Sequence, residues 1–556
     1  MALLRREGFD GKRYVTTTWQ LLYGEGEEMT SSSELGFYLD TWSPTANGPV
    51  QGIQAFDAAP PNATIANLNN WQDVAVWKGI PYAASTAGNN RWRPPQPRAP
   101  WNTTFVADRF GDGCPTTSGQ SPNVSEDCLN LNIWSAANSS DAKLPVILWT
   151  HPAGGSGADP LFDGAGMAAQ GIVFVNYNHR DGAFGFLALP ELTKEFLSDT
   201  NANATVGANW AVLDQYAALR WVHGNIAAFG GDPGRITVVG QSAGSAAVYH
   251  TVNAPHDLVP EGTVFAAIAE SGIRDPRDPL AASLAESYNN ATYSLQLGEA
   301  FLKVNNATTL SELRKIPWKN LRGTASFPGS GGGFRPTLDG YALSDTYARL
   351  LARPPSHSVP LMTGNTRDES GAVFGLNMTL AQYTAAITKQ YGTLSERALA
   401  AWPASNDSEA EAAFNLHWQD TSRVSSWGFA RGWNNVSSSP IYTYFWDHAP
   451  PGQNQGAHHM SEINYVFNNL YKTNLPWQLE DYAIARRMSA YWANFARTGR
   501  PNVDVDARQD DLPVWRPTLA NETVTMRVGD GWGDILIAGK ERIRLITDYF
   551  NEQVPF

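Results

Sequence analysis

The sequence predicts an α/β protein in which a large, mostly parallel central sheet is covered by helices and carries long insertions. Short apolar runs of strand length alternate along the chain with longer stretches that have apolar residues at helical spacing. This alternation is typical of parallel sheets with both faces buried. The chain has 556 residues, of which 42% are hydrophobic and 17% charged. That length and balance allow a sizeable buried core.

The expected elements follow one another from strand to helix and back. Strands are predicted at residues 144–149 and 171–175, because both are continuous apolar runs of buried-strand length. A helix over residues 213–228, a third strand over 235–239 and a second helix over 242–251 continue the pattern. The strands are therefore expected to lie mostly parallel, with the helices as their connections.

The chain is expected to form one domain. No linker rich in proline, glycine or serine divides it, and no repeat of about 20–50 residues is visible. Residues 1–75 show no sustained period, and we expect them to form an N-terminal extension packed on the same domain. Residues 76–556 are expected to form that domain, with surface loops at 275–279 and 329–333.

The charge balance and the length of the apolar runs bear on two kinds of partner, nucleic acids and membranes. There are 40 Lys and Arg residues against 53 Asp and Glu, which gives a formal net charge of −13. A nucleic-acid binder needs clusters of Lys and Arg to neutralise phosphates, and no such run is present. No segment reaches the roughly 18–20 consecutive apolar residues that span a bilayer. We therefore expect no nucleic acid and no membrane span.

Cysteines and glycosylation sequons favour a secretory history. The only two cysteines, Cys114 and Cys128, are able to close one small loop, although two buried free thiols are the alternative. The first seven residues lack the apolar core of a signal peptide, so either the signal has been removed or the sequons are unused. The eleven Asn-X-Ser/Thr sequons begin at Asn62, Asn102, Asn123, Asn138, Asn203, Asn290, Asn306, Asn377, Asn406, Asn435 and Asn521.

The most informative motif is Gly-X-Ser-X-Gly at residues 240–244, between a predicted strand and a predicted helix. In a strained strand-to-helix turn, small residues two positions either side of the serine let the backbone pass closely. The hydroxyl of Ser242 would then project into a cleft, and the N–H of Ala243 would face a developing oxyanion. A plain tight turn is the alternative interpretation.

Longer motifs surround this pentapeptide. Phe-Gly-Gly-Asp-Pro stands at residues 229–233, and further motifs lie at 126–132, 178–186 and 492–499. Together they resemble the type-B carboxylesterase and cholinesterase family of α/β-hydrolases, in the same order over about residues 75–550. The resemblance implies the α/β-hydrolase fold, a single catalytic domain and the activity of a serine carboxylesterase.

The resemblance also implies the other two members of a catalytic triad. The motif at residues 364–370 matches the family segment that supplies the acid and places it at Glu369, with the adjacent Asp368 as the alternative. The motif at residues 456–463 places the base at His459, with His458 as the alternative. The chain order serine, acid, histidine is the one expected for this fold.

These residues describe acyl transfer. A histidine base would deprotonate Ser242, which attacks an ester carbonyl, and the imidazolium would protonate the departing alkoxide. The reaction needs no metal or organic cofactor. The spacing of His459 and Glu462 is not a metal signature, and no second histidine-rich cluster supports one.

The sequence departs from the family pattern in its first oxyanion element. The usual His-Gly-Gly-Gly is replaced by His-Pro-Ala-Gly-Gly at residues 151–155, and proline has no N–H to donate. Matching positions assigns the donors to Ala153 and Gly154, whereas a shift by one residue would assign them to Gly154 and Gly155. A turn without a catalytic role is the remaining alternative.

Two further departures bear on the substrate. Gln241 stands where much of the family has a glutamate, and the segment between the two cysteines contains neither an aromatic residue nor the apolar stripe of a lipase lid. We therefore expect an esterase acting on a neutral, small or medium ester as its small-molecule partner. An interfacial lipase and a non-catalytic cholinesterase-like binding protein are the alternatives. The oligomeric state is not indicated by the sequence.

Overall fold

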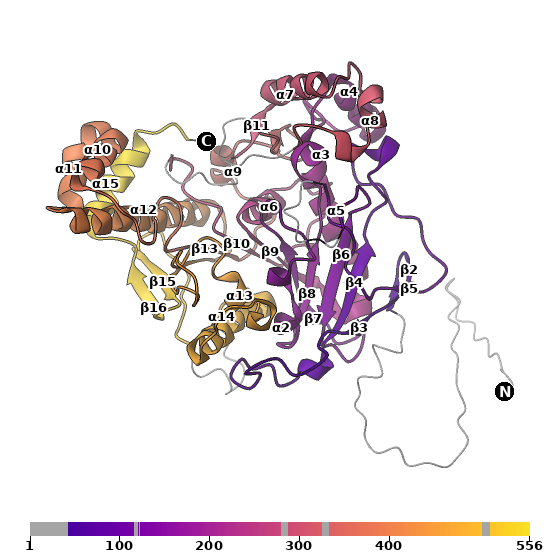
Figure 1. Cartoon of the computed structure of the whole chain (residues 1–556), viewed down its shortest axis with the longest axis horizontal. Coiled ribbons are helices and arrows are strands. Elements are labelled where there is room, and N and C mark those ends of the chain that lie inside the picture. The colour runs from indigo at the N-terminus through magenta and orange to yellow at the C-terminus, as the bar shows by residue number, and fades with distance from the viewer. Residues whose placement is uncertain are drawn as a thin grey trace, which may run out of the picture.

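The computed structural model describes residues 43–115, 121, 123–279, 287–324, 333–502 and 512–555. Within them, eleven strands form one central sheet in the order β16-β15-β14-β13-β10-β9-β7-β8-β6-β4-β3 (Figure 1). The strands of this sheet are β3 (Ile53–Gln54), β4 (Ala75–Pro81), β6 (Asn130–Ser135), β7 (Leu144–Thr150), β8 (Val173–Tyr177), β9 (Gly231–Gln241), β10 (Ala266–Glu270), β13 (Leu361–Thr366), β14 (Ile441–Trp446), β15 (Val524–Val528) and β16 (Gly533–Leu536).

The middle of the sheet is parallel and its two borders are antiparallel. Strands β8, β7, β9, β10, β13, β14 and β15 pair in parallel, whereas β6, β4 and β3 at one border and β16 at the other pair antiparallel. The predicted mostly parallel sheet is confirmed. Small accessory pairings involve β1 (Ser43–Thr45), β2 (Gly48–Gln51), β5 (Phe105–Val106), β11 (Asn289–Asn290) and β12 (Thr337–Leu338).

Helices cover both faces of the sheet (Figure 1). Along β7, Val146 and Leu148 belong to one apolar cluster, while Ile147 and Trp149 belong to another. Because alternate side chains of a strand point to opposite faces, these clusters are the two layers of the core. Helices α5 (Trp210–Asn225) and α6 (Ala243–Val252) contribute to the first, and α13 (Ile463–Val466) and α14 (Leu479–Thr498) to the second.

A third apolar cluster lies at one end of the molecule, where four helices pack together (Figure 1): α10 (Leu380–Tyr391), α11 (Ser395–Ala401), α12 (Asp407–Val436) and α15 (Lys540–Asn551). The remaining α-helices of the described ranges are α2 (Ala165–Ala168), α3 (Gly182–Phe186), α4 (Pro190–Thr200), α7 (Ala291–Val304), α8 (Leu310–Lys315) and α9 (Tyr347–Leu351).

The predicted elements are present, with shifts at their ends. The strand expected over 171–175 begins at Val173, because Gly171 adopts a left-handed turn with φ of 75°. The helix expected over 213–228 ends at Asn225 and continues as a 3₁₀ turn. Residues 275–279 form the expected loop with a turn, and most of the loop expected at 329–333 lies outside the described residues.

The two cysteines form the predicted disulfide. Cys114 and Cys128 are bonded, with their Cα atoms 5.0 Å apart, and both are fully buried.

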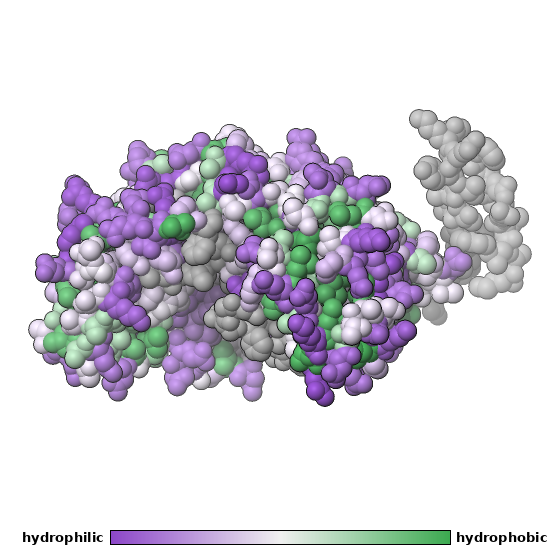
Figure 2. All heavy atoms as spheres, turned by 90° about the horizontal axis from the view of Figure 1, so that it is seen from above, coloured by the Kyte–Doolittle hydropathy of each residue, from purple (hydrophilic) through white to green (hydrophobic). Residues whose placement is uncertain are grey.

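In Figure 2, hydrophilic and hydrophobic residues are interspersed over the face shown. Among the helices of the described ranges, none is both long and apolar enough to cross a membrane.

Candidate active site

The predicted site residues follow strands that end at one edge of the sheet. Parallel pairing sets Gln241 at the end of β9 opposite Glu270 at the end of β10, and Glu270 in turn opposite Gly364 of β13. Strands β13 and β14 end together, at Thr366 and Trp446. The carboxyl ends of neighbouring parallel strands meet at one edge, where open α/β sheets place their ligand sites. Segments distant in the sequence therefore converge there.

Ser242 lies in the turn between β9 and α6 and has a left-handed backbone, with φ of 58° and ψ of −120°. A Cβ atom on Gly240 would lie 2.3 Å from the carbonyl oxygen of Gly244, and one on Gly244 would lie 2.0 Å from that of Thr150. Real Cβ atoms do not approach so closely, so both positions require glycine. The strained turn that the motif predicts is present.

The predicted acid and base are in direct contact. Nδ1 of His459 lies 2.5 Å from Oε2 of Glu369, and because a carboxylate only accepts, Nδ1 carries the hydrogen. The other oxygen, Oε1, accepts from the backbone N–H of Thr366 at 3.0 Å and lies 3.7 Å from the guanidinium of Arg274. The side chain of Glu369 is 4% exposed and that of His459 is 40% exposed. The imidazole is thus held at one nitrogen and accessible.

The contact shifts both pKa values. Burial acts to raise the pKa of Glu369, but the hydrogen bond and charge of His459, together with Arg274, outweigh it and lower that pKa. Burial likewise acts to lower the pKa of His459, but Glu369 and then Glu462 outweigh it and raise that pKa. The pair therefore favours a carboxylate beside a readily protonated imidazole.

The two alternative residues have other partners. Oδ2 of Asp368 accepts from the N–H of Ala457 at 2.7 Å and from Nη2 of Arg367 at 2.8 Å. Nδ1 of His458 lies 3.2 Å from the carbonyl oxygen of Gly456. Among the described residues, the carboxylate of Asp368 has no hydrogen bond to an imidazole, and the imidazole of His458 has none to a carboxylate.

The nucleophile and the base are not joined directly. Among the described residues, no hydrogen bond links the hydroxyl of Ser242 to His459. Instead, Nε2 of Gln241 lies 3.3 Å from Nδ1 and 3.2 Å from Nε2 of the imidazole. The neutral side chain next to the serine therefore faces the predicted base.

The candidate oxyanion donors differ in their hydrogen bonds. Within the described part of the chain, nothing accepts from the N–H groups of Ala153 or Ala243. The N–H of Gly154 is 3.4 Å from a carboxylate oxygen of Asp181, whereas that of Gly155 donates to Pro152 O at 3.0 Å in a turn. The N–H groups of Ala153 and Gly154 are thus less engaged than that of Gly155, and the choice between the two pairs stays a prediction.

Several polar residues around the site were not found from the sequence. The fully buried Glu462 interacts electrostatically with His459 and with the equally buried Glu270. Burial raises the pKa of Glu270 to about 8, and burial with the charge of Glu270 raises that of Glu462 well above its usual range. For both carboxyl groups, burial disfavours the charged form. Arg274 and Glu270 lie outside every motif recognised in the sequence, and Glu462, within the motif at residues 456–463, was weighed there only against a metal site.

Left-handed backbone marks the same region. Besides Ser242, the residues directly after Glu270, Glu369 and His459 have positive φ values of 51°, 57° and 76°. Non-glycine residues in this region are uncommon and cluster at functional sites.

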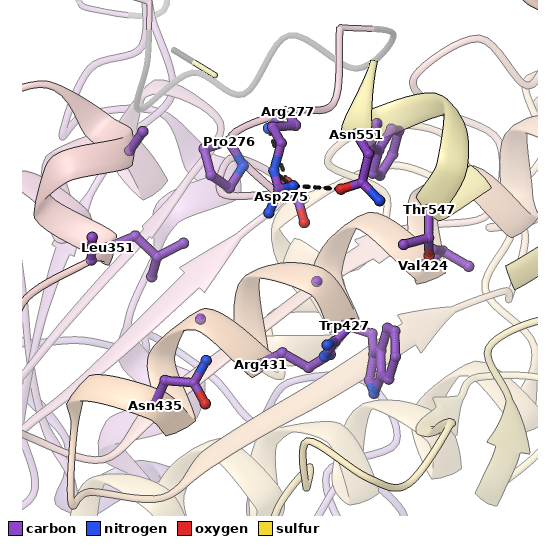
Figure 3. A pocket seen from close by; sticks show the side chains of 15 residues that line it. Asp275, Pro276, Arg277, Leu351, Val424, Trp427, Arg431, Asn435, Thr547 and Asn551 are labelled. Atoms are coloured by element: carbon purple, nitrogen blue, oxygen red, sulfur yellow. Dashed lines mark hydrogen bonds and ion pairs between the residues drawn. The ribbon is translucent and has the colours of Figure 1, made fainter. Parts of the chain in front are cut away.

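A cavity of about 370 Å³ lies elsewhere, lined in part by Asp275, Arg277, Trp427 and Arg431 (Figure 3). Both of its arginines have partners within the lining, since Arg277 donates to Asn551 and the guanidinium of Arg431 lies 4.7 Å from the centre of the Trp427 ring. Its lining includes none of the predicted site residues. In the described ranges, no group of three or more His, Cys, Asp or Glu residues is placed to hold a metal.

Comparison with known proteins agrees with this geometry. The model of the carboxylesterase family matches residues 62–531. Fumonisin B1 esterase of Sphingopyxis macrogoltabida is 34% identical over 77% of this chain and 80% of its own length. Para-nitrobenzyl esterase of Bacillus subtilis (strain 168) is 30% identical over 78% and 88%, and acetylcholinesterase of Danio rerio is 29% identical over 81% and 80%. A solved structure of PNB esterase aligns with a TM-score of 0.68 and 26% identity, over 90% of this chain and 98% of the other.

Proposed function

The chain belongs to the carboxylesterase family and is a carboxylic ester hydrolase, and we propose that it cleaves neutral esters through Ser242, His459 and Glu369. The observation that carries this assignment is the 2.5 Å contact between Glu369 Oε2 and His459 Nδ1, beside a serine in a strained turn. A buried carboxylate on one imidazole nitrogen leaves the other free to act as a base.

The reaction proceeds in two halves. Nε2 of His459 removes the proton from Ser242 Oγ as Oγ bonds to the carbonyl carbon, and the imidazolium then protonates the leaving alkoxide. Water attacks the acyl-enzyme with the same base, which releases the acid and restores the serine. When substrate binds, the side chain of Gln241 moves away from Nε2 of His459, and this nitrogen then accepts the hydrogen bond of the Ser242 hydroxyl. Catalytic hydrogen bonds are often misaligned in the free enzyme.

The N–H groups of Ala153, Gly154 and Ala243 stabilise the tetrahedral oxyanion. The unpaired N–H groups of Ala153 and Ala243 and the weak 3.4 Å contact of Gly154 support this set. Ala243 is also the first residue of α6, where the helix dipole favours negative charge. Removing one donor of such a hole typically costs about 10²–10³ in kcat.

A neutral substrate fits the groups around the base. Gln241 gives no negative charge to attract a cationic alcohol, and the buried Glu270 and Glu462 have raised pKa values that favour their neutral forms. We therefore expect a neutral small or medium ester to be preferred over a choline ester.

A fluorophosphonate probe and a matched pair of esters test the proposal. The probe should label wild type but not Ser242→Ala, and kcat/KM should be higher for nitrophenyl butyrate than for butyrylthiocholine. An unlabelled wild type would favour a non-catalytic binding protein. A rate that jumps when the ester forms an emulsion would favour an interfacial lipase, and a preference for the thiocholine ester would contradict the neutral substrate class.

We further propose that residues 76–556 form one catalytic domain and that residues 43–75, the described part of the expected N-terminal extension, pack on it, whereas residues 1–42 of the expected extension lie outside the described residues. The pairing of β3 with β4 at the border of the central sheet supports this organisation.

A secreted, glycosylated protein is also proposed. All eleven sequon asparagines are exposed, whereas fourteen asparagines outside sequons are buried. Glycans require exposed asparagines, and the disulfide fits an oxidising compartment. Material from a eukaryotic secretory host should lose mass on glycosidase treatment and show no free thiol when denatured. Unchanged mass would contradict the glycosylation, and two titratable thiols would contradict the disulfide.

A further inference from the structure

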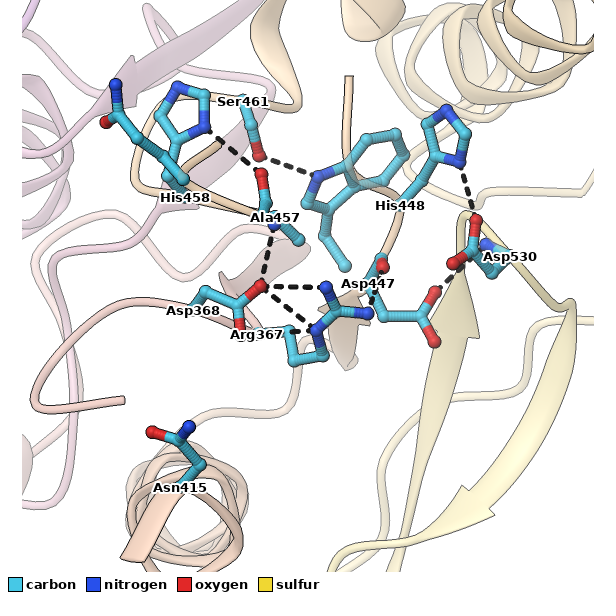
Figure 4. Close-up of polar contacts among 12 residues, drawn as sticks. Arg367, Asp368, Asn415, Asp447, His448, Ala457, His458, Ser461 and Asp530 are labelled. Atoms are coloured by element: carbon cyan, nitrogen blue, oxygen red, sulfur yellow. Dashed lines mark hydrogen bonds and ion pairs between the residues drawn. The ribbon is translucent and has the colours of Figure 1, made fainter. Parts of the chain in front are cut away.

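The turn that carries the predicted acid is bonded to the loop that carries the predicted base at more than one point (Figure 4). The N–H of Asp368 donates to the carbonyl oxygen of Ala457 at 3.0 Å, and the N–H of Ala457 donates back to Oδ2 of Asp368 at 2.7 Å. Asp368 precedes Glu369 by one residue, and Ala457 precedes His459 by two. The two contacts therefore tie together the segments that must bring acid and base into register.

Arg367 is hydrogen-bonded to the start of the same loop. Its backbone N–H donates to Trp446 O at 2.8 Å, and Nη1 donates to Asp447 O at 2.8 Å (Figure 4). The rest of the guanidinium is turned to Asp368, with Nη2 2.8 Å from Oδ2. The side chain of Asp368 is only 5% exposed and that of Arg367 is 27% exposed, so the carboxylate end of this ion pair is shielded from solvent.

The loop after β14 needs such support. Residues 447–458 contain no helix or strand other than a single bridge between His458 and Asp368. Gly456 has φ of 69°, and a Cβ atom there would lie 2.2 Å from Oδ2 of Asp368. The aspartate thus packs directly against the backbone that leads to His459.

We propose that Arg367 and Asp368 are positioning residues that hold the loop of His459 so that its imidazole meets Glu369. The proposal deepens the assigned function and rests on the triad of Ser242, Glu369 and His459. Three consecutive residues of one turn then reach three points of the loop, at Asp447, Ala457 and His459. A misplacement of about 1 Å from such a support can cost about 10²-fold in rate.

The support acts through geometry and not through charge. The charged groups that interact with His459 are Glu369, Glu462 and Arg274, while the carboxylate of Asp368 is neutralised by Arg367. Loss of the support should therefore lower kcat while moving the pH midpoint of kcat/KM less than Glu369→Gln does, because Glu369 keeps its charge near the imidazole. Loss of the charge of the acid itself would move that midpoint furthest.

The test compares Asp368→Ala, Asp368→Asn and Arg367→Met with Glu369→Gln. Active sites are titrated with a fluorophosphonate, so that kcat is counted per folded, reactive serine. We expect Asp368→Ala to lower kcat by about 10–100-fold with KM nearly unchanged. Asp368→Asn retains an acceptor for Ala457 N–H and should recover part of that loss, and Arg367→Met, which leaves both bonds to Ala457, should be milder than Asp368→Ala.

Asp548→Asn is the matched control. It removes another Arg–Asp pair, the 2.8 Å contact with Arg397 between α11 and α15, and should leave kcat unchanged. Wild-type kcat per titrated site in Asp368→Ala would overturn the proposal, even if that variant melts earlier. Asp368→Asn as damaging as Glu369→Gln, with a moved pH midpoint, would instead make Asp368 the acid and overturn the proposed triad. Labelling of Ser242→Ala would show that Ser242 is not the nucleophile and would overturn the proposed function on which the inference rests, whatever the kcat of Asp368→Ala.

Discussion

The turn that holds Ser242 and the loop that holds His459 are fixed by different physical means. Residues 240–244 form a turn between a strand and a helix. Backbone atoms approach both glycines of this turn closely, and this close approach determines the conformation of the turn. Residues 447–458 form a long loop that is tied by hydrogen bonds and ion pairs to other segments. The nucleophile is therefore set locally, whereas the position of the base depends on the rest of the fold.

The largest effects should come from the reacting groups themselves. Ser242→Ala and His459→Ala should each lower kcat by about 10⁵–10⁶-fold, and the double variant should be hardly worse, because residues that act as one unit are non-additive. Steady-state kinetics of the three variants check this. Losses that multiply would mean that the turn and the loop do not serve one mechanism.

The next effect concerns the steric fixation of the turn. Gly244→Ala places a Cβ atom 2.0 Å from Thr150 O, and we expect it to lower the free energy of unfolding by about 2–3 kcal/mol and to displace Ser242. Urea unfolding and kcat per titrated site measure both results. Gly224→Ala is the control, because a Cβ atom at this α5 position meets nothing within 4 Å. Equal stability of the two variants would show that the turn tolerates a side chain.

The same contrast explains how much the sequence predicts. The parallel sheet follows from strand-length apolar runs, and the turn of Ser242 from five adjacent residues, because both depend on local pattern. Glu369 and His459 were found only through resemblance to a family, and with Ser242 they stay predictions. Arg274 and Glu270 gave no signal, since they reach the site only when distant strands pair.

Choosing between adjacent residues also required the fold. Asp368 and Glu369 are both carboxylates in one turn, and no local pattern states which of them faces the imidazole. In the structure, the backbone after β13 is oriented so that Asp368 accepts a hydrogen bond from Ala457 and Glu369 accepts one from His459. The preference for Glu369 is thereby supported on geometric grounds.

A smaller effect is expected from Arg274, whose guanidinium lies 3.7 Å from Glu369. Its positive charge acts to lower the pKa of His459. Because the reaction needs neutral His459, Arg274→Met should raise the pKa of the base and move the acid limb of kcat/KM to higher pH. A pH profile of the titrated enzyme measures the shift.

The control for that shift is Arg277→Met, since Arg277 is bonded to Asn551 at the surface and does not contact the acid. Its pH profile should match that of wild type. An acid limb that stays in place in Arg274→Met, or moves to lower pH, would show that the electrostatic setting of the base does not depend on this arginine.

The smallest effect concerns His448 at the start of the loop. Nε2 lies 2.9 Å from Asp481 Oδ1 and Nδ1 lies 2.5 Å from Asp530 Oδ1, so the protonated ring joins the loop to α14 and to the residues after β15. Burial acts to lower the pKa of His448, but the two carboxylates outweigh it and raise that pKa above the ordinary 6.5. A raised folded-state pKa contributes stability that is complete below about 6.5 and is lost as pH rises through the folded value.

His448→Gln should therefore be less stable than wild type at about pH 6, and the difference should shrink by about pH 9, where a raised histidine pKa is being exceeded. Urea unfolding of both proteins at the two pH values measures it. Gly244→Ala supplies the contrast, because the contact between its Cβ atom and a carbonyl oxygen does not titrate, so its deficit should be nearly the same at both pH values. A deficit in His448→Gln that is equally independent of pH would mean that shape, and not the charged imidazole, holds this end of the loop.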